Sequence, residues 1–295
     1  MNHRFYCVSA PAFTTQMKAA CKQYPGLMPI DNLRCFFNEK IPNVLTSVGT
    51  NISAKPKDRA INHKGIVAFA EKFPETRDDI LLKECNWAVD NGGYQIAQCF
   101  VLKEHLDEYR HNFHEFVRDQ NRNFHMTFTL DMVPMSAGPD GSAPCLFDTV
   151  SEMYDVNFRS YAEAAALPDA VREKMRCVFH FGGPRIFRAW RRMLFQEGLA
   201  ERFTHFATGG LVHSNGFKSL PVVGFTVPLV PLLVFAKEHG RPAFDYHVLG
   251  QGQPMHILKM RFIEAHVKRT TGIDVHFTHD ALSPLNESFF RGGLT

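Results

Sequence analysis

The chain has 295 residues, of which 45% are hydrophobic and 21% are charged, and its net charge is +3. This length suits one large α/β barrel or two ordinary domains, and this composition is that of a globular protein with a sizeable core. No apolar run approaches the ~20 residues of a membrane span. The seven cysteines are irregularly spaced, which favours a cytoplasmic protein with reduced thiols. They include no C-x-x-C pair, so no structural zinc site is expected.

Short apolar runs alternate with helical patterns along the first half of the chain. The runs predict strands at 6–9, 43–48, 87–90 and 127–131. Helical spacing is found at 14–23, 65–73 and 96–120. A Pro/Gly-rich stretch at 134–144 follows the fourth strand, and we expect it to lie over the strand ends as a lid or binding loop.

The same alternation continues to the end of the chain. Strands are expected at 177–181, 204–208, 246–249 and 275–278, and helices at 154–166, 168–174, 185–198, 227–239 and 255–270. Eight strands with intervening helices, and no linker-like stretch, predict a single α/β domain over 1–295 that forms a (β/α)₈ TIM barrel. Only about fifteen residues follow the last strand, so the final helix must be short or atypical. A doubly wound sheet is the alternative.

Three aspartates lie where predicted strands end. Asp90 and Asp131 end the third and fourth strands, and Asp280 follows the eighth. The carboxyl ends of barrel strands meet at one face, which is where barrel enzymes keep their catalytic groups. We therefore expect three carboxylates at one mouth, although each aspartate taken singly also suits a turn or a helix N-cap.

Glycine pairs accompany these strand ends. In WAVDNGGYQ at 87–95, Gly92 and Gly93 would let a flat ligand approach the main chain, although D-N-G-G is also an ordinary turn sequence. Further glycine pairs close the next strands, at 182–183, 209–210 and 250–252. A mouth with acidic groups, bare amides and few lysines suits a nucleobase better than a free phosphate. Histidines near the strand ends are interpreted as packing or hydrogen-bonding residues: His180, His213 and His279.

Basic residues cluster in RIFRAWRR at 185–192. With Trp190, they could follow a nucleic-acid backbone. The alternative is the solvated face of an amphipathic helix. The arginines concerned are Arg185, Arg188, Arg191 and Arg192.

Six segments, in order, resemble motifs of the tRNA-guanine transglycosylases. VDNGGYQ at 89–95 resembles D-S-G-G-[FY]-Q, and TLDMVP at 129–134 resembles their F-D-E-C strand end. The other four are VFHFGG at 178–183, FATGGLV at 206–212, YHVLGQGQP at 246–254 and GIDVHFTHDALSP at 272–284. The ordered set covers about residues 87–284, and it implies a base exchange through a covalent glycosyl-enzyme.

The resemblance implies a role for each matching residue. Asp280 would be the nucleophile and Asp90 the general acid/base. Asp274 is the rival nucleophile, but it precedes the eighth strand and would lie at the opposite face. The residues implied to bind the base are Asp131, Tyr94, Gly93, Gly210, Leu211, Leu249, Gly250 and Phe181.

Three departures from that family bear on the substrate. Phe181 replaces the family's glutamine before Gly-Gly, the zinc subdomain is missing, and 285–291 replaces the arginine-bearing segment. These losses resemble the DNA-directed branch of phage and bacterial modification systems. The expectation is therefore a cofactor-free DNA guanine transglycosylase that inserts a 7-deazaguanine, in the host cytoplasm if phage-encoded. The alternatives are the same chemistry on tRNA, a non-catalytic nucleic-acid-binding partner subunit, and a barrel glycoside or nucleoside hydrolase.

Overall fold

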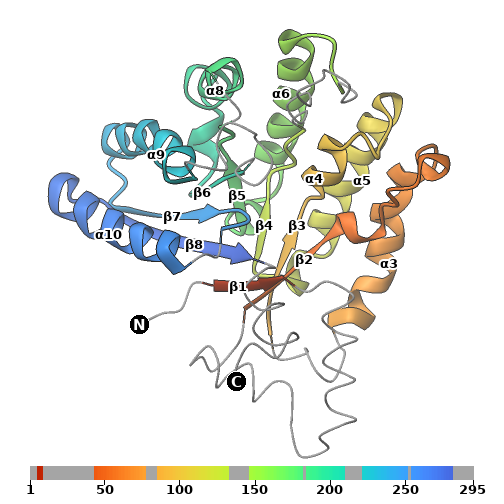
Figure 1. The fold of residues 1–295 in the computed structure, drawn as a ribbon, viewed down its shortest axis with the longest axis horizontal. Helices are drawn as coiled ribbons and strands as arrows, with labels where there is room; N and C mark the ends of the chain where they lie inside the picture. Colours follow the sequence, from red (N-terminus) through yellow and green to blue (C-terminus); the bar gives the residue numbers. More distant parts are fainter. Residues whose placement is uncertain are drawn as a thin grey trace, which may run out of the picture.

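The structure, a computed structural model, describes residues 5–8, 43–77, 85–132, 146–181, 184–209, 221–251 and 254–281. It is an α/β fold whose all-parallel sheet curls into a barrel-like shape with helices on the outside (Figure 1). The strands are β1 (Phe5–Val8), β2 (Asn43–Ser47), β3 (Asn86–Asp90), β4 (Met126–Phe128), β5 (Met175–Val178), β6 (His205–Thr208), β7 (Ala243–Val248) and β8 (Asp274–Ala281).

Each strand pairs in parallel with the next strand along the chain, from β1 to β8. β1 also pairs with β8, with Tyr6 opposite Asp280. This sequential order contradicts the doubly wound alternative, in which the order of strands reverses at a switch point. All strands therefore present their carboxyl ends at one edge.

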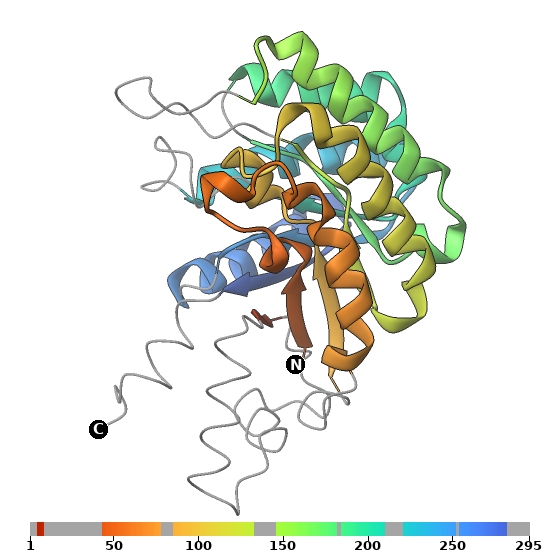
Figure 2. The same cartoon turned by 90° about the vertical axis from the view of Figure 1, so that its right-hand side faces the viewer.

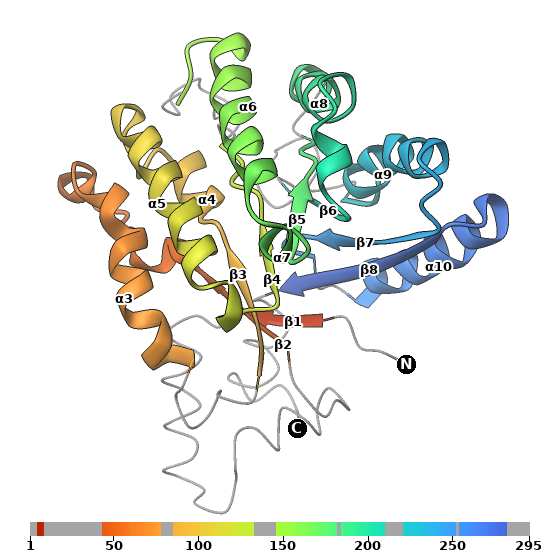
Figure 3. The same cartoon turned by 180° about the vertical axis from the view of Figure 1, so that it is seen from behind.

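Helices follow one another around the outside of the sheet (Figures 1 and 3). Figure 2 looks onto the side that carries α3, α5 and α6, where α5 packs between the other two. The α-helices are α3 (Gly65–Arg77), α4 (Gly93–Ala97), α5 (Leu106–Asp119), α6 (Val150–Ala166), α7 (Asp169–Arg172), α8 (Pro184–Arg191), α9 (Pro221–Glu238) and α10 (Pro254–Thr271). The described helices include none long and apolar enough to cross a membrane.

The expected elements are confirmed wherever they fall on described residues, with one exception. The single helix expected at 96–120 is wrong, because α4 ends at Ala97 and α5 begins at Leu106. Cys99 lies between them with a φ of 56°, a left-handed conformation that ends a helix. The short 3₁₀ helix η4 (Lys103–His105) then leads into α5. The helix expected at 14–23 and the loop at 134–144 lie outside the described residues.

Apolar side chains pack on both faces of the curled sheet. The larger cluster fills the space between the strands and the outer helices. A smaller cluster fills the inside of the curl, and its members are all at most 4% exposed: Leu45, Ala88, Met126, Phe128, Val178 and Ala207. Burial on both faces is why these strands are nearly continuous apolar runs rather than alternating ones.

Candidate active site at the carboxyl end of the sheet

Three carboxylates meet at the carboxyl edge of the curled sheet. Asp90 ends β3, Asp280 is the penultimate residue of β8, and Asp131 lies just beyond β4. The pKa of Asp90 is raised to about 6, chiefly because its carboxyl group is buried and further because of the charges of Asp280 and Asp131. The structure thus brings together the aspartates that the strand ends predicted.

Asp90 is anchored by the neighbouring strand. The Ser47 hydroxyl, at the end of β2, donates to Oδ2 of Asp90 over 2.6 Å. The Gly92 amide donates to the same oxygen over 3.3 Å. Both contacts favour the ionised carboxyl and lower the pKa of Asp90, but burial outweighs them. Asp90 can therefore gain or lose a proton close to neutral pH.

Asp280 is oriented by an imidazole and a backbone amide. Nε2 of His247 lies 2.9 Å from Oδ1 of Asp280, and Nδ1 of the same ring lies 2.8 Å from the Thr278 hydroxyl. Because a carboxylate can only accept, Nε2 carries the hydrogen in this pairing. The Gly250 amide donates to the same oxygen over 3.0 Å, from a turn in which Gly250 has a φ of 74°. Both contacts use Oδ1, so among the described residues Oδ2 keeps its acceptor capacity for a ligand.

Asp131 is held on both of its oxygens. Nδ2 of Asn91 donates to Oδ1 over 2.8 Å, and Nε2 of His180 lies 3.1 Å from Oδ2. A carboxylate oxygen can accept a second hydrogen bond, so Asp131 keeps acceptor capacity for a ligand. His180 also packs against the Trp190 ring, with 5.7 Å between the ring centroids, so the packing that was one of its expected roles is confirmed.

Contacts within the protein explain why positions 92 and 93 are glycines. Gly92 adopts a φ of 75°, and a Cβ there would lie 2.6 Å from the Tyr109 hydroxyl, which donates to the Asn91 carbonyl over 2.9 Å. A Cβ on Gly93 would lie 3.0 Å from Oδ1 of Asn91. Its amide already donates to that oxygen over 2.7 Å. The pair therefore lets α5 and Asp131 pack against the turn; binding of a base by Gly93 stays a prediction.

The other residues expected to bind a base surround this edge. Tyr94 lies on α4 and is 46% exposed. Leu249 follows β7 and packs against the inner cluster, while Phe181 follows β5 and meets the Phe187 ring edge-on. Gly210 and Leu211 lie outside the described residues.

Asp274 is remote from the carboxylates. It begins β8, six residues before Asp280, which corresponds to about 20 Å along a strand. Its Oδ2 lies 2.6 Å from Nζ of Lys268 at the amino end of the sheet. The expectation that Asp274 lies at the opposite face is confirmed.

The four arginines near β5 are all exposed. Arg185, Arg188 and Arg192 line a cleft of about 1280 Å³ between α8 and the first turns of α6, which the Thr149 hydroxyl caps. Arg191 faces a second groove, toward α9. One of the two interpretations of this segment had Trp190 act with the arginines on a nucleic-acid backbone. That part is wrong, because Trp190 is 1% exposed and donates to the Tyr161 hydroxyl.

Sequence reasoning missed the residues that position the carboxylates. Ser47 and His247 belong to neighbouring strands and meet the aspartates only across the sheet. Strand periodicity could have shown that both side chains face the inside of the sheet, because residues two apart in a strand share a face. Ser47 lies two residues after Leu45, which belongs to the inner cluster, and His247 lies two residues before Leu249, which packs against it. No family model, curated protein or solved structure matches the chain. Its function must therefore be inferred from the site itself.

Proposed function

We propose that the chain is a (β/α)₈ barrel that exchanges guanine in DNA for a 7-deazaguanine, such as 7-cyano-7-deazaguanine, through a covalent bond between Asp280 and the sugar. One observation carries the proposal: two carboxylates of one mouth have different environments. Asp280 accepts hydrogen bonds from His247 and Gly250, whereas burial raises the pKa of Asp90 to about 6. Such pairs divide the roles of nucleophile and proton carrier in glycosyl chemistry.

The exchange takes two displacements. Oδ2 of Asp280 attacks C1′ of the nucleotide, the C1′–N9 bond breaks, and the departing guanine takes the proton of Asp90. A 7-deazaguanine then attacks C1′ through N9, its N9 proton passes to Asp90, and the bond to Asp280 breaks. Atoms and charges balance without an oxidant or a cofactor, and a nearby carboxylate stabilises the positive charge that develops on the sugar.

Recognition of the base would involve the residues around the mouth. Asp131 has acceptor capacity for the N–H edge of a guanine, and Tyr94 and Leu249 offer an aromatic face and an apolar side chain for the ring. A base in a duplex must be extruded before C1′ can be attacked. Arg185, Arg188 and Arg192 line the neighbouring cleft at the same edge and would bind the phosphates of the strand.

The test is an exchange assay. Labelled 7-deazaguanine is incubated with the protein and either duplex DNA or tRNA, and uptake of label and release of guanine are both measured. Asp280→Asn keeps the shape of the side chain and removes the nucleophile, and Asp274→Asn is the matched control at the other end of β8. We expect label in DNA, guanine released in equal amount, no uptake with Asp280→Asn, and full uptake with Asp274→Asn.

The alternatives give different results in the same assay. Label that enters only tRNA replaces the proposed substrate by tRNA. Release of guanine without uptake of label identifies a hydrolase, and binding of nucleic acid without either event identifies a non-catalytic partner subunit. Uptake that survives Asp280→Asn but not Asp274→Asn overturns the assignment of the nucleophile.

A further inference from the structure

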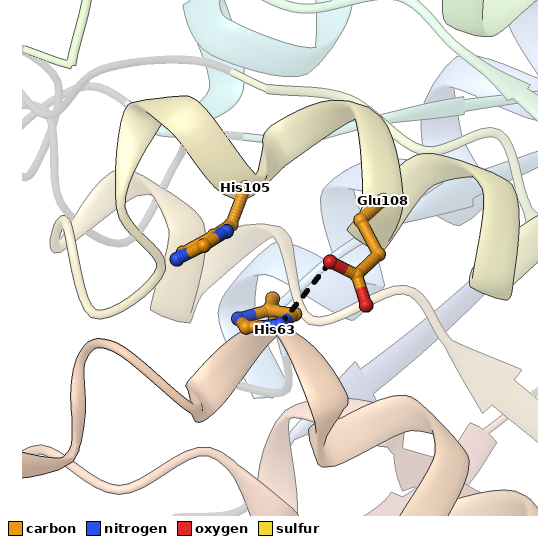
Figure 4. A group of neighbouring side chains, drawn as sticks. All are labelled: His63, His105 and Glu108. Atoms are coloured by element: carbon orange, nitrogen blue, oxygen red, sulfur yellow. Dashed lines mark ion pairs between the residues drawn. The ribbon is translucent and has the colours of Figure 1, made fainter.

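A second cluster of titratable side chains lies outside the candidate active site (Figure 4). It consists of His63 on η3 (Asn62–Lys64), His105 at the end of η4 and Glu108 in the first turn of α5. Each residue offers one ligand atom, and these atoms all lie within 4.8 Å of one another. The His63 and His105 rings are stacked with centroids 4.0 Å apart, and Nε2 of His63 lies 3.2 Å from Oε2 of Glu108.

His63 is held firmly in this place. Its side chain is 5% exposed, and Nδ1 is buried without a hydrogen-bond partner among the described residues. The adjacent Asn62 side chain accepts from the Ser53 amide and donates to the Ser53 and Phe100 carbonyls. The η3 segment is thereby joined to the loop that precedes η4. Nε2 of His63, which faces Glu108, is the ring nitrogen placed to share an ion with it, because Nδ1 points elsewhere.

The cluster combines two imidazole rings with one carboxylate, and these groups come from η3, η4 and the first turn of α5. Glu108 is half exposed, with 50% of its side chain accessible, so one side of the cluster is open to solvent.

We propose that His63, His105 and Glu108 bind one divalent transition-metal ion, with Zn²⁺ as the ion whose chemistry fits best. Two imidazoles and one carboxylate are a ligand set that zinc uses, with water in the fourth position. Tetrahedral bonds of about 2.1 Å place ligand atoms about 3.4 Å apart, so separations of up to 4.8 Å must shorten by as much as about 1.4 Å. The His105 ring must also turn out of its stack with His63, because an imidazole nitrogen binds a metal in the plane of its ring. His105 and Glu108 can supply this movement, because neither is fully buried.

The ion would have a structural consequence. It would tie η3, which follows β2, to the first turn of α5, which follows β3. Tyr109 is the next residue of α5 after Glu108, and its hydroxyl donates to the Asn91 carbonyl beside Asp90. Metal binding would thus fix the helix turn that supports the Asp90 loop. This inference does not depend on the transglycosylase proposal.

The test uses the full chain, freed of metal by dialysis against a chelator. Zinc is titrated by calorimetry, and Co²⁺ is added separately to record its visible absorption. We expect one site per chain, a higher melting temperature with zinc, and a Co²⁺ spectrum without the intense bands of thiolate ligands. His105→Ala and Glu108→Gln should weaken zinc binding by at least about 100-fold, since even loss of a group that only orients a ligand costs roughly 10–100-fold.

Matched controls come from the same part of the chain. His111→Ala and Glu104→Gln remove exposed residues of α5 and η4 that lie outside the cluster, and they should leave zinc affinity unchanged. The proposal is overturned if the wild-type chain has no site of one ion per chain, if His105→Ala binds zinc as tightly as wild type, or if thiolate bands appear with Co²⁺.

Discussion

Aspartates at the two ends of the curled sheet have different partners. At the amino end, Asp245 pairs with Arg176 over 2.9 Å and also lies 3.5 Å from Nδ1 of His205. At the carboxyl end, Asp90, Asp131 and Asp280 have contacts with a hydroxyl, an amide group, histidines and backbone amides. Among the described residues, no lysine or arginine forms an ion pair with these three aspartates.

The difference suggests a structural role for the Asp245–Arg176 pair and a functional role for the three carboxylates at the other end. The charge of Asp245 is compensated by Arg176, and removing one partner of such a pair destabilises a protein. The three carboxylates of the other end repel one another, and the charges of Asp280 and Asp131 help to raise the pKa of Asp90. Uncompensated charge of this kind destabilises a protein and is concentrated at functional sites. The following predictions test the contrast, from the largest expected effect to the smallest.

Asp280→Asn should abolish the proposed exchange and leave the fold intact. Loss of a covalent nucleophile lowers the rate by at least about 1000-fold. The free energy of unfolding should fall little or rise, because one of three mutually repelling charges is removed. Exchange kinetics and urea denaturation measure the two effects, and loss of stability equal to the loss of activity would place Asp280 in a structural role.

Arg176→Met should lower the stability of the fold and leave the proposed exchange intact. It leaves Asp245, whose side chain is 29% exposed, without its arginine, which should cost about 1–2 kcal/mol of the free energy of unfolding after screening by solvent. Exchange by the molecules that remain folded should be unchanged. The double variant Arg176→Met with Asp245→Leu should regain most of this stability, as measured by urea denaturation. If the double variant does not regain stability, Arg176 and Asp245 must stabilise the fold through contacts other than their mutual charge compensation.

Asp90→Asn should stabilise the protein at neutral pH. The pKa of Asp90 is raised from 3.8 to about 6 in the folded chain, so the wild type loses stability as pH rises from about 4 to about 6 and is constant above that. The variant removes this loss, and its advantage should reach at most about 3 kcal/mol above pH 6 and vanish near pH 4. Denaturation at pH 4.5 and 7.5 measures it.

The same variant tests the proton carrier. Formation of the covalent intermediate needs protonated Asp90, so its single-turnover rate in the wild type should fall about tenfold per pH unit above about 6. With Asp90→Asn the rate should be low and nearly independent of pH. A wild-type profile that is flat from pH 5 to 8 would exclude Asp90 from this role.

Tyr109→Phe should have the smallest effect. It removes the hydrogen bond from α5 to the buried Asn91 carbonyl, which costs about 1 kcal/mol. The nearby Asp90 would be less well positioned, so the exchange rate should fall more than the affinity for the base. Tyr246→Phe is the matched control, since its hydroxyl is equally buried and donates to the Phe225 carbonyl of α9 over 2.9 Å.

The sequence predicted the frame of the site better than its details. Apolar runs located the strands because strands buried on both faces are continuous in sequence, and the parallel order then placed Asp90, Asp131 and Asp280 at one edge. The break at Cys99 was missed because its left-handed backbone has no strong signal in a non-glycine residue. Trp190 was misjudged because a basic helix surface does not reveal which side chain faces the core.

The partners of the carboxylates could not be predicted in the same way. Ser47 is 43 residues from Asp90, and His247 is 33 residues from Asp280. Such pairs depend on the register between strands, which a single sequence does not contain. The glycine turn was located correctly, but the tight contacts with Tyr109 and Asp131 that explain it appear only in three dimensions.

The filled interior of the curl has a kinetic consequence. Beneath the carboxylates, Phe128 and its apolar neighbours are buried, and the His247 ring lies 5.0 Å from the Phe128 ring, so the described side chains fill the inside of the sheet below the site. A base would therefore reach the carboxylates from the carboxyl edge. In the proposed reaction, guanine must leave before the second base can enter by the same opening. The two bases would then compete for one vacancy, and steady-state rates would show the parallel-line pattern of a ping-pong enzyme.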